Sequence, residues 1–385
     1  MTNNMCPPGN PEIQVWSTGK IPETLERQIQ FTASHSDIVR VAMMADAHAG
    51  PKVPNGMAVA TRTRVYPQMV GADIGCGVSI LAFQGTSANL AEEKLLALLD
   101  RFSHSIPTLK NPASKSPSRL PETCATEMLS SDALKKESLR DGRLQLGTIG
   151  RGNHFCELLL DESERLWAMV HTGSRSMGQA ITSFHLGKAC PEESGGLASL
   201  SLADKAGRDY WQDMEWAIAY ATENRLRILN RMADALESMA GLIPDEDSYL
   251  DCPHNFARIE NIRGEELIIH RKSANAAASG TLGIIPGSMA TTSRIVSGLG
   301  NEDSLRSSSH GAGRKLSRSE SVLKTKAKDL EKQMRSVVFH RQMANQLRDE
   351  APGAYKDLNE VMRAQRDLVK TVSILKPILN DKRVG

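Results

Sequence analysis

The 385-residue sequence lacks the features that are typical of secreted and membrane-spanning proteins. Its six cysteines are scattered without a CxxC pair or a regular framework, and the opening residues MTNNMCPPGN lack the charged and then apolar pattern of a signal peptide. No uninterrupted apolar stretch approaches the roughly 20 residues that cross a bilayer. We therefore expect a soluble protein of the reducing cytoplasm, with no membrane partner.

The sequence also lacks a strong excess of charge. Its 47 Lys and Arg residues and 45 Asp and Glu residues leave a net charge of +2, so a site for a polyanion has to come from local Arg, Lys and His side chains. The sequence shows no internal repeat. Its length allows a substantial core, in one large domain or two of ordinary size.

Hydrophobic periodicity predicts both strands and helices. Short β-rich runs beside glycine predict strands, and the acidic turn DESE between two of them predicts a hairpin. Apolar residues at three- and four-residue spacing predict helices. The predicted strands are 39–44, 77–83, 154–160, 165–170 and 266–270; the predicted helices are 90–104, 203–241 and a charged tail from about 322; and the Pro- and Ser-rich segment 105–122 is expected to be an exposed loop.

The stretch GADIGCGVSI, residues 71–80, holds Asp73 and Cys76 between glycines. A free Cys is usually a small buried hydrophobe. Here Gly75 and Gly77 leave the thiol accessible, and Asp73 supplies a second ligand to the same ion. A redox Cys is an alternative, although no second Cys lies nearby in the sequence.

Half of the ten histidines stand beside Gly, Asn or Ser in motif-like segments. A lone His near a strand end is more often structural than a ligand. Together with Asp73 and Cys76, however, these imidazoles form the donor set of a transition-metal site. The histidines are His48, His154, His171, His254 and His310.

Three segments carry glycines in patterns that suit phosphate. LGTIGRGNH at 146–154 contains GxxGxG, but the residues after it look extended rather than helical, so we do not expect a Rossmann site. Its glycines instead place Asn153 and His154 at a site. The segments 284–293 and 307–318 combine Gly, hydroxyl groups and Arg, which bind anionic oxygens, although each alone is equally explained as a polar loop.

A set of motifs from about residue 40 to the C-terminus resembles the RtcB family of GTP-dependent RNA-splicing ligases. In sequence order the motifs are DAHAG, GADIGCG, GRGNHFCE, HTGSR, HNF, HRK, PGSM, SHGAGR and PGAYKD. The resemblance implies an α/β (α+β) fold, with residues 1–385 in a single RtcB-like domain of mixed β-sheets and flanking helices, distinct from Rossmann and P-loop cores. It implies a ligase of RNA repair, RNA splicing or tRNA processing, which joins a 2′,3′-cyclic phosphate or 3′-phosphate RNA end to a 5′-hydroxyl end.

The resemblance further implies two Mn²⁺ ions per chain, with the thiolate of Cys76 between them. Asp73 and His154 complete one metal site, and His171 and His254 complete the other. A bridging thiolate suits this arrangement because it screens the repulsion of two close dications.

The second implied cofactor is GTP, from which His310 takes GMP as a histidine-guanylate. Imidazole attacks phosphorus only through an unprotonated nitrogen, so His310 has to be neutral. Arg151 and Arg175 are candidates to hold an RNA phosphate. The residues implied to contact the nucleotide are Asn153, Glu157, Ser288, Ser293, Ala312, Gly313, Arg314, Tyr355 and Lys382.

The sequence departs from the family's usual motifs in a few places. Thr172, Ser273 and Ala290 replace the Ser of HSGSR, the Gly of HRKGA and the final Gly of PGSMG. Arg383 follows Lys382, whereas the family usually stops at Lys-Gly, which leaves the register of the tail open. No proposed ligand or nucleophile is lost, so we expect an active, divergent bacterial paralogue. The natural RNA (tRNA, rRNA or mRNA) and the need for an activating protein are left open.

Two other functions fit parts of the same pattern. A dinuclear-metal phosphoesterase acting on RNA ends would also use open metal positions and phosphate loops, but it needs no covalent nucleotide carrier, so GTP would not label His310. A non-catalytic RNA-end-binding protein would hold a structural metal, typically one Zn²⁺ with four ligands.

Overall fold

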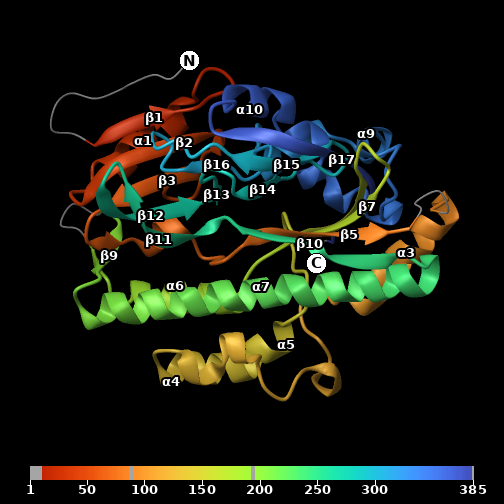
Figure 1. Cartoon of the computed structure of the whole chain (residues 1–385), viewed down its shortest axis with the longest axis horizontal. Helices are drawn as coiled ribbons and strands as arrows, with labels where there is room; N and C mark the ends of the chain where they lie inside the picture. Colours follow the sequence, from red (N-terminus) through yellow and green to blue (C-terminus); the bar gives the residue numbers. More distant parts are fainter. Residues whose placement is uncertain (1–10, 86–89, 192–195, 384–385) are drawn as a thin grey trace.

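A computed structural model describes residues 11–85, 90–191 and 196–383 (Figure 1). Its helices are α1 (Glu23–Ala33), α2 (Pro67–Val70), α3 (Glu92–Ser105), α4 (Asp132–Glu137), α5 (Arg143–Gln145), α6 (Arg175–Leu186), α7 (Lys205–Ala240), α8 (Arg318–Lys324), α9 (Ala327–Gln333) and α10 (Leu358–Ala364). Short 3₁₀ or π turns lie at Ala113–Lys115, Glu122–Cys124, Thr126–Met128, Ser138–Gly142, Arg341–Met343, Gln346–Glu350 and Pro352–Ala354.

The strands form two larger sheets, one with the order β1-β2-β3-β12-β11 and one with the order β10-β5-β7-β6-β17-β15-β14. In the first sheet β1 runs parallel to β2 and the other neighbours are antiparallel, whereas every neighbouring pair of the second is antiparallel. The strands of the first sheet are β1 (Glu12–Val15), β2 (Ile38–His48), β3 (Asn55–Thr61), β11 (Asn255–Ile262) and β12 (Glu265–Lys272). Those of the second are β5 (Gly77–Gln84), β6 (Phe155–Leu160), β7 (Leu166–Thr172), β10 (Ile243–Pro253), β14 (Leu282–Ile285), β15 (Ser293–Gly298) and β17 (Val369–Asp381).

Two small sheets complete the strands of the described ranges. One pairs β13 (Ala274–Ala276) with β16 (Ser307–Ser309), and the other joins β4 (Arg64–Val65), β9 (Ala198–Ser201) and β8 (Cys190–Pro191). This mixed α/β architecture confirms the predicted fold class. The antiparallel pairing also excludes a doubly wound Rossmann sheet, as expected.

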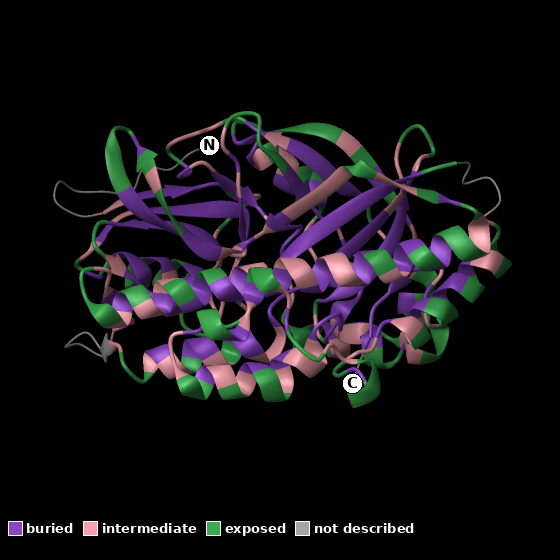
Figure 2. Cartoon of the chain, turned by 60° about the horizontal axis from the view of Figure 1, so that its bottom comes forward, coloured by how far each residue is buried: buried purple, intermediate pink, exposed green. Residues whose placement is uncertain are grey.

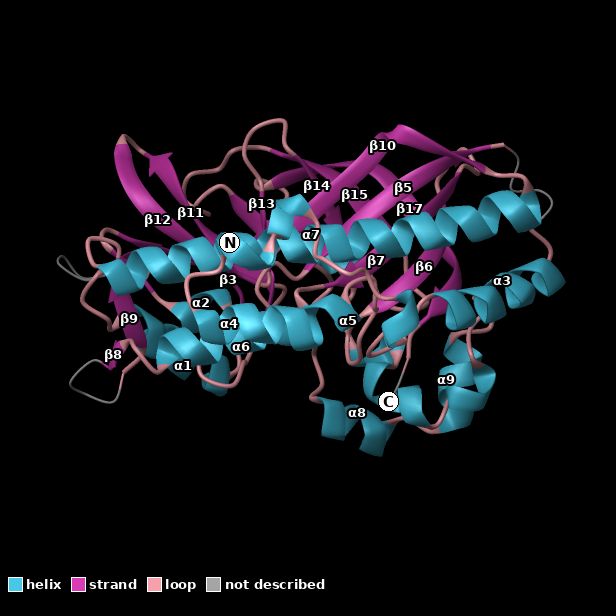
Figure 3. Cartoon of the chain, turned by 90° about the horizontal axis from the view of Figure 1, so that it is seen from below, coloured by secondary structure: helices cyan, strands magenta, loops and turns pink. Residues whose placement is uncertain are grey.

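The long helix α7 runs beneath both larger sheets (Figures 1 and 3). Met214 and Ile218 in its first half pack in one cluster with residues of α6, β11 and β12. Ile228 and Met232 in its second half pack in another with residues of β5, β6 and β7. The helix ends at Gly241, whose left-handed conformation (φ 68°) suits glycine. One helix therefore fixes the two sheets relative to each other.

The central strands of the second sheet, β5, β6 and β7, are buried on both faces (Figure 2). In β5 the side chains alternate, so that Leu81 and Phe83 face α7 while Val78 and Ile80 face a cluster shared with β14, β15 and β17. These last strands are distant from β5 in the sheet order but contact its inner face. The sheet therefore curls around its own core.

The predicted elements occur close to the expected positions. The five predicted strands fall within or at one residue of β2, β5, β6, β7 and β12, the DESE hairpin joins β6 to β7, and the predicted helices match α3 and α7. Residues 105–122 contain one 3₁₀ turn and are mostly exposed, although Ile106, Asn111 and Leu120 are buried. No helix of the described ranges is long and apolar enough to cross a membrane.

The prediction of a helical tail from about 322 was wrong in its last part. The tail starts with α8, α9 and α10, but it finishes as the 13-residue strand β17. Thr371, Val372 and Ile374 in this strand are β-branched, which favours the extended conformation in which the strand pairs with β6 and β15. The acidic strand β10 was also missed, because its sequence IPDEDSYLDCP has weak strand propensity.

Candidate active site

The site lies where chain segments cross between the two larger sheets. Cys76 directly precedes β5, His154 precedes β6, and His171 lies near the end of β7. His254 is the residue at which the chain passes from β10 of one sheet to β11 of the other, and its backbone N–H donates to the Cys76 carbonyl at 2.8 Å. Antiparallel pairing places Val78 opposite His171, which brings these strand ends together.

Glycines allow the turn that carries Asp73 and Cys76 to approach its neighbours. The Cys76 N–H donates to the Asp73 carbonyl at 3.1 Å, which closes the turn. Gly75 has φ 70°, and a Cβ there would lie 2.8 Å from the Cα of Ile218 in α7. A Cβ on Gly173 would collide with the Asp73 carboxylate. Close packing thus explains why glycine occupies positions 75 and 173.

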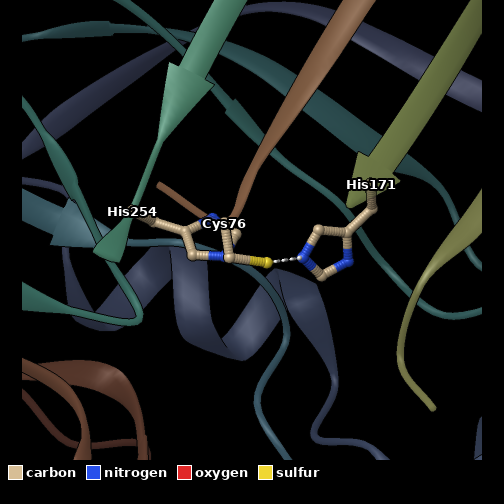
Figure 4. Close-up of side chains that lie close together, drawn as sticks. All are labelled: Cys76, His171 and His254. Atoms are coloured by element: carbon tan, nitrogen blue, oxygen red, sulfur yellow. Dashed lines mark hydrogen bonds between the residues drawn. The ribbon is translucent and has the colours of Figure 1, made fainter. Parts of the chain in front are cut away.

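The side chains form two donor groups that share Cys76. Asp73, Cys76 and His154 form one group, and Cys76, His171 and His254 form the other, with the ligand atoms of each group within 4.8 Å of one another. Figure 4 shows the second group. The Cys76 Sγ lies 3.6 Å from Nε2 of His154 and 3.4 Å from Nε2 of His171. The structure thus assembles all five residues that were predicted as metal ligands.

The orientation of His154 is set by its second nitrogen. Nδ1 lies 3.0 Å from the carbonyl of Ile149, which is a pure acceptor, so Nδ1 carries the proton. Thr172 donates to the same carbonyl at 2.7 Å. Nε2 is left facing Asp73 Oδ2 at 3.1 Å and the Cys76 thiol, with its lone pair free for an ion.

The electrostatics of the cluster fit a bound cation. Burial, followed by the charge of the neighbouring His154, holds the pKa of His171 well below its usual value, and burial with the charge of His310 does the same for His254. Burial, followed by the Asp73 charge, raises the pKa of the Cys76 thiol. Within the described residues, Nδ1 of buried His254 has no hydrogen-bond partner. Neutral imidazoles, a carboxylate, a thiol and an orphaned nitrogen together are the donor set that a transition metal satisfies.

Arg225 of α7 holds the backbone on both sides of the cluster. Its guanidinium is fully buried and donates to the carbonyls of Gly75 at 2.7 Å and Thr172 at 2.9 Å, the residues next to Cys76 and His171. Asp251, three residues before His254, accepts from Nε at 2.6 Å and from Nη2 at 2.9 Å. One side chain therefore connects the segments that carry the second donor group.

His310 lies beside the metal-ligand cluster and is oriented by Asp46. Its Nδ1 lies 2.7 Å from Asp46 Oδ2, which also accepts the backbone N–H groups of His310 at 3.1 Å and Gly311 at 3.3 Å. The carboxylate is completely buried, and Lys356 donates to the carbonyls on either side of it, those of Ala45 and Ala47. With Nδ1 bound to Asp46, Nε2 of His310 is the nitrogen available for chemistry.

Four of the five motif histidines form a continuous row. Ring centroids are 5.4 Å apart between His154 and His171, 5.1 Å between His171 and His254, and 4.7 Å between His254 and His310. His48 belongs to neither donor group and instead contacts the Asp46 carbonyl at 3.1 Å. Burial lowers the pKa of His48 to about 4.

A cavity of about 1150 Å³ opens onto this row. It is lined by most of the residues predicted to contact metal or nucleotide, but not by Ser293, whose hydroxyl lies beneath the loop and accepts the Gly287 N–H at 3.1 Å. His154 also lies behind the cavity wall. The predicted residues that line the cavity are Asp73, Cys76, Asn153, Glu157, His171, His254, Ser288, His310, Ala312, Gly313, Arg314, Tyr355 and Lys382.

One end of the cavity is organised around the buried carboxylate of Glu350. Nζ of Lys382 lies 2.8 Å from it, Nη1 of Arg314 lies 3.1 Å from it, and the Tyr355 hydroxyl donates to it. The Arg314 guanidinium also lies over the Tyr355 ring, 5.1 Å from its centroid. The charges of Lys382 and Arg318 outweigh burial, which acts in the opposite direction, and lower the pKa of Glu350.

Glu157 lies on the cavity wall near Lys382 and behaves differently. Burial raises its pKa to about 8, although a hydrogen bond from Asn380 at 2.7 Å and the charge of Lys382 act to lower it. The carboxyl of Glu350 therefore stays ionised, whereas the carboxyl of Glu157, in the same cavity, titrates near neutral pH.

The sequence comparisons decide the family. A profile described as tRNA-splicing ligase RtcB matches residues 28–133 and 114–383. The chain belongs to the RtcB family. It is 34% identical over 403 residues to the RNA-splicing ligase RtcB of Escherichia coli K12, covering 96% of this chain and 97% of that one. It is 31% identical to RNA-splicing ligase RtcB2 of a second E. coli strain, with 93% and 92% covered, and 26% identical to the tRNA-splicing ligase RtcB of Pyrobaculum aerophilum, with 89% and 86% covered.

The departures from the usual RtcB motifs have structural correlates. Ser273 has φ 54°, the left-handed region that a glycine adopts without strain, and its N–H donates to Asn255 at 2.8 Å. Thr172 keeps the hydroxyl that a Ser would supply beside His154. Nothing in the structure requires a glycine at Ala290, which has no positive φ.

The two arginines considered for RNA phosphate occupy different environments, and neither lines the cavity. Arg175 starts α6 with φ 57°, donates from Nε to Thr148 Oγ1 at 3.2 Å, and packs against Gly150 behind Asp73. Arg151 is exposed. Their proposed contact with RNA stays a prediction.

Sequence reasoning missed several residues of this RtcB site. Asp46 lies in the recognised motif DAHAG, where attention fell on His48 instead. Arg225 lies within a helix that was interpreted as scaffold, and Glu350 precedes the motif PGAYKD. The local sequence does not show that a charged residue will be buried. The one available indication is that the residue lies in or next to a motif, as Asp46 and Glu350 do.

Proposed function

We propose that this chain is an RNA ligase that joins 2′,3′-cyclic phosphate or 3′-phosphate ends to 5′-hydroxyl ends with GTP and Mn²⁺. The observation that carries the proposal is that two donor groups sharing Cys76 lie beside one cavity. Cys76 and His310 both line this cavity, and Nδ1 of His310 is held by Asp46. Metal-dependent hydrolysis or a structural metal site requires no covalent nucleotide carrier, whereas His310 is oriented to serve as one.

The metal ligands are proposed to be those of the two donor groups. Asp73, Cys76 and His154 would hold one Mn²⁺, and Cys76, His171 and His254 the other. When bound, the ions supply Lewis acidity that neutralises phosphate oxygens and orients the reacting groups. The thiol has to stay reduced to serve as a ligand, which suits a cytoplasmic location.

His310 is proposed to carry the nucleotide. Its Nε2 attacks the α-phosphorus of GTP, so that a P–N bond forms while the bond from phosphorus to the bridging oxygen breaks and pyrophosphate leaves. Asp46 accepts a hydrogen bond from the Nδ1–H group and, without taking the proton, stabilises the positive charge that develops on the ring. Burial of the carboxylate in a fixed position means that no reorganisation is needed during the attack.

Two transfers complete the proposed reaction. An oxygen of the RNA 3′-phosphate attacks the phosphorus on His310, which releases the imidazole and forms an RNA–GMP anhydride. The RNA 5′-hydroxyl then attacks the 3′-phosphate, forms the new phosphodiester and expels GMP. A cyclic phosphate is first opened by water to a 3′-phosphate, a step that does not use His310.

The far end of the cavity is proposed to bind the guanine nucleotide. Glu157 can accept from the N–H groups of guanine, and Lys382 can donate to its oxygen. Ser288, Ala312 and Gly313 also line the cavity, where the Ser288 hydroxyl and the Gly313 N–H can face phosphates. Asn153, Arg314 and Tyr355 line the same space.

Labelling with GTP tests the proposal. Purified protein with Mn²⁺ and α-³²P-GTP should acquire an acid-labile, hydroxylamine-resistant label, as a phosphoramidate does. His310→Ala should abolish the label and the joining of 3′-phosphate ends but should still open a cyclic phosphate. His104→Ala, which changes an exposed histidine of α3, is the matched control.

The same assay separates the alternatives. Release of phosphate from RNA ends without any label would favour a phosphoesterase, and one bound Zn²⁺ without turnover would favour a binding protein. Ligation by the purified chain alone would show that no activating protein is required. Comparing cleaved tRNA, rRNA and mRNA fragments then identifies the preferred RNA.

A further inference from the structure

The end of β17 and the two described residues after it are fixed by an anchor on their outer side. Side chains alternate here: Asn380 and Lys382 line the cavity, while Asp381 and Arg383 point away from it. Arg383 forms a two-pronged ion pair with Asp381, through Nε at 2.9 Å and through Nη2. Both side chains are almost completely buried.

The anchor attaches to the C-terminal end of α3. Nη1 of Arg383 donates to the carbonyl of Ile106, the residue that caps α3, and lies 3.4 Å from the Ser103 carbonyl. A guanidinium suits these last helix carbonyls, which have no partner within the helix and carry partial negative charge. His340 completes the anchor, with its Nε2 3.2 Å from Asp381 and 3.0 Å from the Ser103 hydroxyl.

The inner side of the same segment contacts the cavity. Lys382 Nζ lies 2.8 Å from Glu350 and 5.5 Å from the centroid of the Phe155 ring, and its side chain is 4% exposed. Because Lys382 lies between two anchoring residues, the backbone that carries it cannot shift without breaking the contacts of Asp381 and Arg383. The register that was open from sequence is thereby determined.

We propose that Arg383 is a positioning residue for nucleotide binding. Arg383 acts through Lys382, because it anchors the backbone that carries Lys382 to α3. The proposal rests on the proposed function, since it assumes that Lys382 contacts the guanine nucleotide. Arg383 itself does not line the cavity.

The test measures the KM for GTP and the kcat of protein labelling in single and double variants. Arg383→Ala and Lys382→Ala should each raise the KM for GTP about tenfold with little change in kcat, because ground-state binding of the nucleotide is lost. The double variant should bind GTP no worse than Lys382→Ala alone, because Arg383 acts through Lys382. Arg383→Lys should give an intermediate KM, and Lys376→Ala, an exposed cation of the same strand, should leave the KM unchanged.

The outcomes separate this inference from the proposed function. Equal thermal stability and Mn²⁺ content in the variants keep the KM values interpretable, and Arg383→Gln replaces Arg383→Ala if the latter does not fold. An unchanged KM in the Arg383 variants, or additive effects in the double variant, would overturn the positioning role alone. An unchanged KM in Lys382→Ala would overturn the nucleotide contact of Lys382 and, with it, the role of Arg383.

Discussion

Oδ2 of Asp46 lies 2.7 Å from Nδ1 of His310, although 264 residues separate the two in sequence. Burial acts to raise the pKa of Asp46, but the charge and hydrogen bond of His310 outweigh it and lower the pKa. The carboxylate therefore stays ionised, and it fixes both the tautomer and the direction of the imidazole. In the proposed reaction, Nε2 of His310 is therefore already oriented before any nucleotide binds.

Asp46→Asn should reduce labelling by GTP at least about 100-fold, because an amide no longer stabilises the imidazolium that forms during attack. The Mn²⁺ content should not change, since Asp46 belongs to neither donor group. Labelling rates and metal analysis on the same preparation measure both effects. Asp367→Asn, at an exposed carboxylate bonded to Trp16, is the control, and a fully active Asp46→Asn protein would show that the pair has no catalytic role.

Cys76→Ser should lose more bound metal than a change at a single site, because its thiol belongs to both donor groups. The folded structure should persist, since the hydroxyl is close to the thiol in size. Equilibrium dialysis with Mn²⁺ and the sulfur-to-metal absorption of the Co²⁺-substituted protein measure the loss. Cys124→Ser, at a buried free cysteine outside the site, should retain both signals; full metal occupancy in Cys76→Ser would refute the bridging assignment.

Arg225→Lys should weaken metal binding about tenfold. An ammonium group keeps the charge but cannot bind Asp251 and the carbonyls of Gly75 and Thr172 at once, so the segments carrying Cys76 and His171 lose their common support. Titration with Co²⁺ measures the affinity. Arg227→Lys on the same helix should bind metal normally, and equal affinities in the two variants would show that the clamp is unnecessary.

Glu157→Gln should become more stable than the parent protein as pH rises. The pKa of Glu157 is raised from 4.5 to about 8 in the folded protein. The stability that the neutral, buried carboxyl contributes is therefore fully present below pH 4.5, and it is lost as pH rises through 8 and the carboxyl ionises. We expect similar stability at pH 4.5 and a gain on the order of a few kcal/mol at pH 9. Urea unfolding across this range measures the difference. Exposed Glu266→Gln should show no such trend, and a difference for Glu157→Gln that does not vary with pH would contradict the raised pKa.

The sequence by itself determined the local elements and indicated most of the residues that the structure brings together around the cavity. Periodicity is a property of neighbouring residues, so α7, the β6–β7 hairpin and the strand β5 could be predicted from three- and two-residue spacing. The glycines around Cys76 and the histidines in short motifs also indicated a metal site. These signals are local because a turn or a strand end is formed by a few consecutive residues.

The tertiary structure decided which of these residues meet and what holds them. Strand pairing brings His171 beside Cys76, and the crossing from β10 to β11 brings His254 to the same point. The tertiary structure also places Ser293 beneath a loop instead of in the cavity. In addition, the segment after α10 forms a strand rather than the predicted helix. Asp46, Arg225 and Arg383 each contact groups that are distant in sequence. The spacing of neighbouring residues cannot predict such contacts, because the energy of a buried charge depends on the groups that the whole fold places around it.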